Sequence, residues 1–258
     1  LNKKKEGKQG GMQKKTVIGL LCLIAFVFNG YVPVEAKRAP KKNIVVITTG
    51  GAISGTQIDA MSGEFELSTA GADILAARTL EVKHLANVTY KELFNIPSQE
   101  MSDSNRIQLA KLVDKLAADK TVDGVIITHG TDTIEETAYF LHLTVHTKKP
   151  IILTGALRAS LHPSSDAIQN LIDSVRVAVN KNSLGKGAMV VMNNTIISAR
   201  EVQKNKTFHV NAMGATGMGV MGYVYNEVVD IHSINTGYTV IINLRKDDLL
   251  GDSQREVS

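Results

Sequence analysis

A hydroxyl and a carboxylate stand side by side at Thr131 and Asp132, in the polar turn His129-Gly130-Thr131-Asp132. A hydroxyl can act as a nucleophile, and a carboxylate can accept a proton or bind an amine. The turn directly follows the apolar, β-branched run 124–128, which is typical of a strand buried on both faces. Chemistry at this turn therefore requires a fold that presents the end of that strand to a ligand.

A helix follows the turn and leads to a second strand. Thr133 and Glu136 form the pattern of a capping box, and apolar residues recur on one helical face up to Val145. Lys148-Lys149-Pro150 is predicted to end the helix, and 151–155 is a second apolar strand. Such a β-α-β unit is almost always parallel and right-handed. Ligands bind at the carboxyl ends of its strands, where the helix amino terminus favours a substrate carboxylate.

The same alternation of strand, loop and helix extends through most of the chain. A glycine-rich loop, 49–55, follows the first strand, and 56–68 is polar without sustained periodicity. Because the alternation persists to about Tyr225, we expect a doubly wound α/β fold, with a mostly parallel sheet flanked by helices. The remaining strands are predicted at 43–48, 87–90, 93–96 and 188–192, and the remaining helices at 73–78, 107–116 and 168–179.

The run 124–134, GVIITHGTDTI, together with Thr49-Gly50-Gly51, resembles the bacterial L-asparaginase and glutaminase-asparaginase family in its secreted, type II branch. The resemblance implies that 43–231 form the larger, N-terminal α/β domain of that family. Family members continue into a smaller C-terminal domain, for which this chain has no room, so 232–258 is expected to be a short divergent tail. The polar stretch 56–68 corresponds to the family's flexible loop that closes over the substrate.

The resemblance also assigns roles to individual residues. The family uses a Thr-Lys-Asp triad that positions and activates, and this triad maps to Thr131, Lys204 and Asp132. The residues expected to bind the substrate map to Gly51, Ser98, Gln99, Thr131 and Asp132, and the last four of these are expected to hold its α-carboxylate and α-amino end.

Two positions depart from the family pattern. The nucleophilic threonine of the family maps to Ala52, and the tyrosine that assists it maps to Phe65. Ala52 has no heteroatom and Phe65 has no hydroxyl, and loss of an attacking group commonly costs several powers of ten in rate. Thr131, activated by Lys204, and the nearby Ser54 remain open as substitute nucleophiles.

Three interpretations of function remain open. The first is an amidohydrolase that converts L-asparagine, and in some members L-glutamine, to the acid and ammonia without a metal or cofactor, here at a weak rate. The second is a homologue that binds asparagine or aspartate without turnover. The third is a truncated product that does not fold stably. Family members are homotetramers in which the smaller domain completes a neighbour's active site, so the assembly state of this chain also stays open.

Several polar residues have purely structural interpretations. His129 is structural in the family, which favours that role here. His142 and His146 have the spacing of metal ligands on a helix, but they lack the HExxH glutamate and a third ligand, so an exposed helix end is favoured. Ser98 has a second interpretation as a helix cap near Asp103.

The net charge of +4 is confined to the amino terminus. Six Lys and two Glu precede Lys37, so the remaining chain is neutral, and without a basic patch or aromatic platform nucleic-acid binding is disfavoured. Lys14-Lys15, the apolar run 17–28 and Val34-Glu35-Ala36 are typical of a signal peptide. We therefore expect 1–36, with Cys22, to be removed, which leaves a periplasmic or secreted protein without membrane attachment.

Overall fold

A computed structural model describes residues 40–57, 65–67, 71–78 and 80–232. Except for Pro40, these residues belong to one structural unit that begins at Lys41. Within these ranges no helix is both long and apolar enough to cross a membrane. Residues 1–36, which hold the predicted signal peptide, and all of the predicted tail beyond His232 lie outside the described residues.

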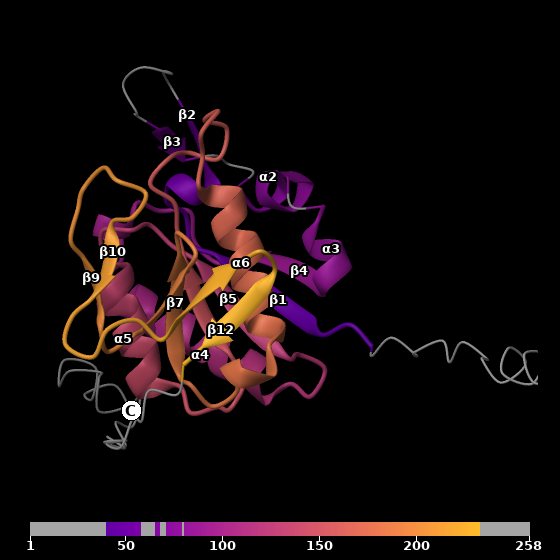
Figure 1. The fold of residues 1–258 in the computed structure, drawn as a ribbon. Coiled ribbons are helices and arrows are strands. Elements are labelled where there is room, and N and C mark those ends of the chain that lie inside the picture. Colours follow the sequence, from indigo (N-terminus) through magenta and orange to yellow (C-terminus); the bar gives the residue numbers. More distant parts are fainter. Residues whose placement is uncertain (1–39, 58–64, 68–70, 79, 233–258) are drawn as a thin grey trace, which may run out of the picture. The chain divides into compact units, whose positions relative to one another are not determined.

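Eight strands form the main sheet, in the order β12-β11-β8-β7-β6-β5-β1-β4. Figure 1 labels β1, β4, β5, β7 and β12 of this sheet. The five strands from β4 to β7 are parallel to one another, which confirms the predicted mostly parallel sheet. The parallel strands are β1 (Asn43–Thr48), β4 (Asn87–Glu92), β5 (Gly124–Thr128), β6 (Ile151–Thr154) and β7 (Ala188–Met192). The sheet continues with three antiparallel neighbours, β8 (Thr195–Ser198), β11 (Gly222–Tyr225) and β12 (Val228–Ile231).

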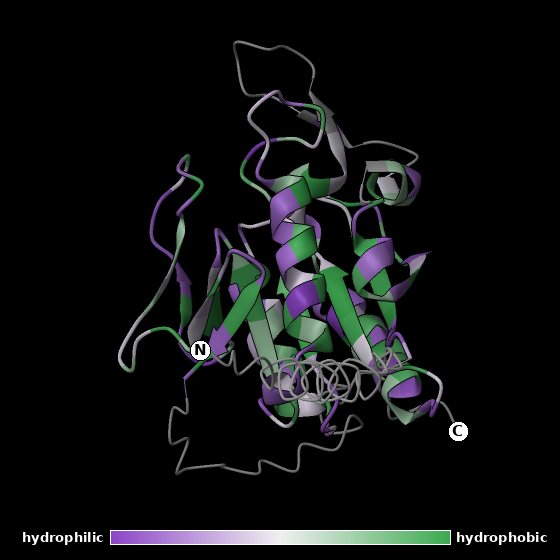
Figure 2. Cartoon of the chain, turned by 45° about the vertical axis from the view of Figure 1, so that its right-hand side comes forward, coloured by the Kyte–Doolittle hydropathy of each residue, from purple (hydrophilic) through white to green (hydrophobic). Residues whose placement is uncertain are grey.

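Helices cover both faces of the sheet, as a doubly wound fold requires. The α-helices are α2 (Gly71–Arg78), α3 (Val82–Leu85), α4 (Asp103–Ala118), α5 (Ile134–Thr144) and α6 (Ala167–Val179). Residues of α2, α3 and α6 pack in one core with Ile126 and Ile152, whereas α4 and α5 pack in a second core with Val125 and Ile127. Figure 2 shows the apolar sheet between helices of mixed polarity. Successive side chains of β5 therefore point to opposite faces of the sheet and pack into two cores, one on each face.

Several short elements lie outside these layers. Strands β2 (Gly55–Gln57) and β3 (Phe65–Leu67) form one hairpin, and β9 (Val202–Lys204) and β10 (Met213–Ala215) form another. β3 and the last two residues of β2 fall within 56–68, the stretch without sustained periodicity, because strands of three residues are too short to show alternation. A short 3₁₀ turn, η3 (Lys181–Ser183), follows α6.

The sheet reverses its winding direction between β1 and β5. β1 lies between β4 and β5, so the chain leaves β1 toward one edge and leaves β5 toward the other. Ligands of open α/β sheets bind at such a switch point, outside the carboxyl ends of the strands. The loop after β1 and the turn after β5 therefore meet where a ligand site is expected.

The connection from β6 through α6 to β7 has the opposite hand to its neighbours. β5-α5-β6 and β6-α6-β7 step in the same direction along the sheet, but α5 and α6 lie on opposite faces. The crossovers into β4 and β5 share the hand of β5-α5-β6. Because parallel crossovers are right-handed in about 98% of cases, β6-α6-β7 is the left-handed exception. Its first segment bonds the loop after β1, where Ser160 Oγ donates to Ile53 O.

After β7 the chain departs from the predicted alternation. Asn193 and Asn194 have φ of 48° and 59°, and Asn226 and Glu227 have φ of 46° and 69°. Two consecutive positive φ angles are typical of a type I′ turn, whose twist suits a two-residue hairpin. β7-β8 and β11-β12 are therefore antiparallel hairpins. The prediction that helices continue to alternate with strands up to Tyr225 is wrong.

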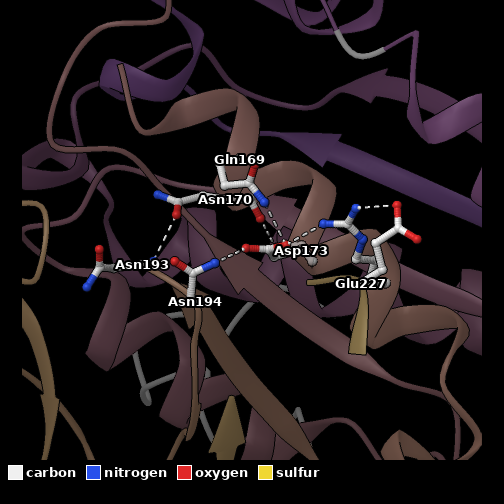
Figure 3. A network of polar contacts seen from close by, with 8 residues as sticks. Gln169, Asn170, Asp173, Asn193, Asn194 and Glu227 are labelled. Carbon is white, nitrogen blue, oxygen red and sulfur yellow. Dashed lines mark hydrogen bonds and ion pairs between the residues drawn. The ribbon is translucent and has the colours of Figure 1, made fainter. Parts of the chain in front are cut away.

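Helix α6 holds the turn between β7 and β8 through a buried carboxylate, Asp173 (Figure 3). Asp173 accepts hydrogen bonds from Gln169 Nε2, Arg176 Nη1 and Asn194 Nδ2, at 2.9, 3.0 and 2.9 Å. Burial raises the pKa of Asp173, and the hydrogen bonds from Arg176, Gln169 and Asn194 oppose that shift. The network ties the antiparallel strands to the helix that packs on the parallel ones.

The ends of α5 and β4 also differ from prediction. Thr133 lies at the N-cap of α5 but makes no cap hydrogen bond, so the predicted capping box is wrong. The helix ends at Thr144, before the predicted stop at 148–150. The segment 93–96 is not a strand: Leu93 N–H and Phe94 N–H both donate to Thr48 O, at the end of β1, which breaks the regular ladder, and Ile96 N–H donates to Thr49 O in the loop after β1.

Candidate active site

The loop after β1 packs directly against the turn after β5. Thr49 donates its backbone N–H and its hydroxyl to Thr128 O, at 3.1 and 2.9 Å. Gly51 has a φ of +81°, and a Cβ added there would lie 2.6 Å from Gly130 Cα. Glycine is required because it adopts this dihedral and lets the two backbones touch. Ala52, the next residue, begins the buried 3₁₀ turn η1 (Ala52–Ser54).

Lys204 reaches this turn from the end of β9. Its Nζ donates to Thr131 Oγ1 at 2.8 Å and also to a carboxylate oxygen of Asp132. Thr131 is buried, and the Lys204 side chain is 15% exposed, whereas that of Asp132 is 45% exposed. The structure thus brings together the three residues that the resemblance maps to one triad, and the group opens to solvent at Asp132.

Gln99 joins the same group from the loop between β4 and α4. Its Nε2 donates to the second carboxylate oxygen of Asp132. Ser98, which with Gln99 begins the 3₁₀ turn η2 (Ser98–Glu100), is buried against the polar turn. A Cβ added at Gly130 would lie 2.6 Å from Ser98 Oγ, and Thr133 Oγ1 donates to Ser98 O at 2.7 Å. This hydrogen bond explains why the Thr133 hydroxyl does not cap α5.

The interpretation of Ser98 as the cap of α4 is wrong. Ser102 occupies the N-cap of that helix, and its hydroxyl accepts from Asn105 N at 3.2 Å. Ser98 therefore does not cap this helix.

His129 is buried beneath the turn. One ring nitrogen lies 2.7 Å from Gly130 O and the other lies 3.0 Å from Thr137 Oγ1. Burial lowers the pKa of His129 to about 4, against an ordinary value of 6.5, while the bond to Gly130 O partly opposes this shift. His129 is thus a neutral, fully bonded residue that supports the turn from below.

The neutral state of His129 predicts a loss of stability in acid. The unfolded chain takes up a proton as pH falls below 6.5, but the folded chain does so only near pH 4. The contribution of His129 to the free energy of unfolding is therefore retained above pH 6.5 and lost as the pH falls from 6.5 toward 4. The loss amounts to about 3 kcal/mol, because each unit of pKa difference corresponds to ~1.4 kcal/mol. Urea unfolding between about pH 7.5 and pH 4 measures this loss. His129→Gln should reduce the slope of the free energy of unfolding against pH, whereas His146→Gln, at an exposed position, should leave it unchanged. Equal slopes in the natural chain and both variants would contradict the prediction.

The two positions that depart from the family pattern lie after β1. Ala52 is buried in η1, and Phe65 begins β3, paired with Gln57 of β2. Ser54, considered as a substitute nucleophile, is buried against the start of α2, because a Cβ added at Gly71 would lie 2.7 Å from Ser54 Cβ. No hydrogen bond among the described residues joins Ser54 to Thr131.

Two site contacts escape prediction from the sequence. Glu135 Oε2, in the first turn of α5, accepts from the backbone N–H of Lys204 at 2.6 Å. Ser160 supports the loop after β1 from a position more than a hundred residues away. Neither residue type carries a local signal for such a contact. Among the described residues, no group of three or more His, Cys, Asp or Glu side chains could hold a metal ion.

Comparison with known proteins gives consistent matches. The family model described as asparaginase, N-terminal, matches residues 43–236. A probable periplasmic L-asparaginase of Haemophilus influenzae is 39% identical over 212 residues, which cover 80% of this chain and 60% of that protein. L-asparaginase 2 of Escherichia coli is 40% identical over 188 residues, covering 73% of this chain and 53% of that protein. This chain therefore spans little more than half the length of these relatives.

A solved structure has the same fold. The crystal structure of a probable cytoplasmic L-asparaginase from Campylobacter jejuni matches with a TM-score of 0.71 and 38% identity, over 74% of this chain and 58% of that one. The family model covers most of the described unit, from β1 to beyond β12. The chain therefore belongs to the asparaginase family and matches the N-terminal part of it.

Proposed function

We propose that this chain holds a binding site for the amino-acid end of L-asparagine or L-aspartate and hydrolyses the side-chain amide only weakly, because the attacking hydroxyl is missing. The observation that carries the proposal is the bonded group Thr131, Asp132 and Lys204 beside the loop after β1, which carries Ala52 in place of a residue with a hydroxyl. The alternative is binding with no turnover at all. The two differ only in whether ammonia is released.

The binding half of the proposal follows from charge. A free amino acid carries an ammonium and a carboxylate. The half-exposed carboxylate of Asp132 suits the ammonium, with Gln99 holding its second oxygen. The substrate carboxylate is favoured near the amino terminus of α5, an eleven-residue helix that begins directly after the turn.

The chemical half concerns the attack on the amide carbon. Hydrolysis breaks the C–N bond of the amide, adds the elements of water, and releases ammonia and aspartate. Covalent catalysis needs a nucleophilic oxygen and a group that accepts its proton. Lys204 donates to both Thr131 Oγ1 and Asp132, so in this arrangement it does not accept the Thr131 proton. We therefore propose that Thr131 orients the substrate or water rather than replacing the missing nucleophile.

The domain limits and location are part of the same proposal. We propose that 43–231 act as the N-terminal domain and that 1–36 direct export to the periplasm or beyond. The apolar run 17–28 between Lys14-Lys15 and Ala36 supports export. The Haemophilus relative carries the description periplasmic, whereas the Campylobacter structure carries the description cytoplasmic.

Calorimetric titration of the mature chain with L-aspartate tests the binding half. We expect saturable binding, and Asp132→Asn should weaken it about tenfold or more, because a bond to a charged group contributes roughly 1.5–3 kcal/mol. Glu100→Gln is the matched control, since Glu100 is exposed in the turn that carries Gln99. Absence of binding, or equal affinities for the Asp132 and Glu100 variants, would contradict the proposed site.

A further inference from the structure

Both the side chain and the backbone of Lys204 are bound by one short segment, 131–135. Its side-chain Nζ donates to Thr131 and Asp132, and its backbone N–H donates to Glu135 Oε2 at 2.6 Å. Thr131 to Glu135 span the end of the polar turn and the first turn of α5. The position of the ammonium therefore depends on two sets of contacts, of which only one involves the ammonium itself.

The backbone contact matters because β9 is not hydrogen-bonded to any strand of the main sheet. β9 pairs antiparallel with β10 alone, in a separate hairpin. Asn205 N donates to Ala212 O at 2.8 Å, which makes Asn205 part of a hydrogen-bonded pair. Residues alternate between bonded and non-bonded pairs along an antiparallel ladder, so the adjacent Lys204 directs its N–H away from β10. That outward N–H is the one Glu135 accepts.

We infer that Glu135 is a positioning residue for Lys204: its carboxylate fixes the β9 backbone against α5, so that the ammonium reaches Thr131 and Asp132. The inference rests on the proposed function in so far as Lys204 belongs to the amide-binding site. A carboxylate suits this place because it is stabilised by the helix amino terminus and makes a charge-assisted bond with the N–H. The adjacent Glu136 is exposed and provides a matched comparison on the same helical turn.

Two measurements on the full mature chain test the placement of Lys204 without any turnover. Hydrogen exchange should quicken at the Lys204 amide about tenfold in Glu135→Ala, because the N–H loses its acceptor. Acylation of the Lys204 amine, followed by peptide mass spectrometry, should also rise several-fold. Glu135→Gln, which keeps an acceptor oxygen, should lie between the natural chain and Glu135→Ala, and Glu136→Gln should match the natural chain. Unchanged Lys204 exchange and acylation in Glu135→Ala would overturn the inference.

The role of Glu135 in the reaction is tested by steady-state kinetics in a reference chain that carries Ala52→Thr and Phe65→Tyr. There Glu135→Ala should lower kcat about tenfold or more with a smaller change in KM, Glu135→Gln should recover part of the loss, and Glu136→Gln should have no effect. A merely structural Glu135 would instead raise acylation at lysines throughout the chain and leave kcat per folded molecule unchanged, which would overturn the positioning role. If the reference chain releases no ammonia, the hydrolytic part of the proposed function fails, while exchange and acylation still decide whether Glu135 holds Lys204.

Discussion

Ammonia release from L-asparagine should rise by about three powers of ten or more when Ala52 is replaced by Thr and Phe65 by Tyr, because the change restores an attacking hydroxyl and its assisting phenol. Ala52 follows Gly51, whose backbone touches the turn that carries Thr131, so a hydroxyl at position 52 enters an already assembled site. The measurement is the steady-state rate of ammonia release by the purified mature chain with and without the two substitutions.

Ala52→Val, combined with Phe65→Tyr, is the control for this experiment. Valine has nearly the shape of threonine without the oxygen, so any gain from added bulk at this buried position would appear in both chains. We expect the valine chain to stay at the natural rate. If the natural chain already matches the threonine chain, and Thr131→Ala abolishes its activity, then Thr131 is the nucleophile and the proposed impairment is wrong.

Asp173→Ala should lower the free energy of unfolding by about 3 kcal/mol, because it removes one partner of a buried charged pair. Asp173 is fully buried, and the Arg176 side chain that donates to it is only 18% exposed. The substitution also removes the acceptor for Asn194, whose turn joins β7 to β8 (Figure 3). Urea unfolding at about pH 7.5 measures the loss.

Two variants separate the parts of this network. Asn194→Gly keeps a residue that tolerates the positive φ of the turn and should cost about 1 kcal/mol for the lost hydrogen bond. Glu227→Gln should have little effect, because Glu227 is 82% exposed and lies 3.6 Å from Arg176. A loss for Asp173→Ala no larger than that for Glu227→Gln would show that the buried network does not stabilise the fold.

The parallel strands can be predicted from the sequence because each one is marked by a pattern within a few consecutive residues. The buried runs that become β1, β5, β6 and β7 are short, apolar and β-branched, and each ends in polar or glycine-rich residues. The antiparallel strands β8, β11 and β12 are harder to predict. Their hairpins depend on Asn-Asn and Asn-Glu pairs adopting positive φ, and asparagine signals this conformation less strongly than an Asn-Gly pair does.

Only part of the site could be derived from residue types. Thr131 and Asp132 stand out because they lie directly after a buried strand, at the edge where ligands bind. Lys204 carries no such signal, since an isolated lysine is usually a surface residue, and only the family resemblance associates it with Thr131. Glu135 has an apparent local role at the helix amino terminus, which hides its contact with a strand 69 positions later.

The most direct test of the proposed function follows ¹⁵N-amide-labelled L-asparagine by NMR in the presence of the natural mature chain. One sample reports binding, through broadening of the ligand signals, and turnover, through the appearance of aspartate and labelled ammonium. We expect broadening that unlabelled L-aspartate reverses, with conversion at least about a thousandfold slower than in the chain that carries Ala52→Thr and Phe65→Tyr. Conversion at a comparable rate, or no broadening at all, would contradict a site that binds the amino acid but lacks its nucleophile.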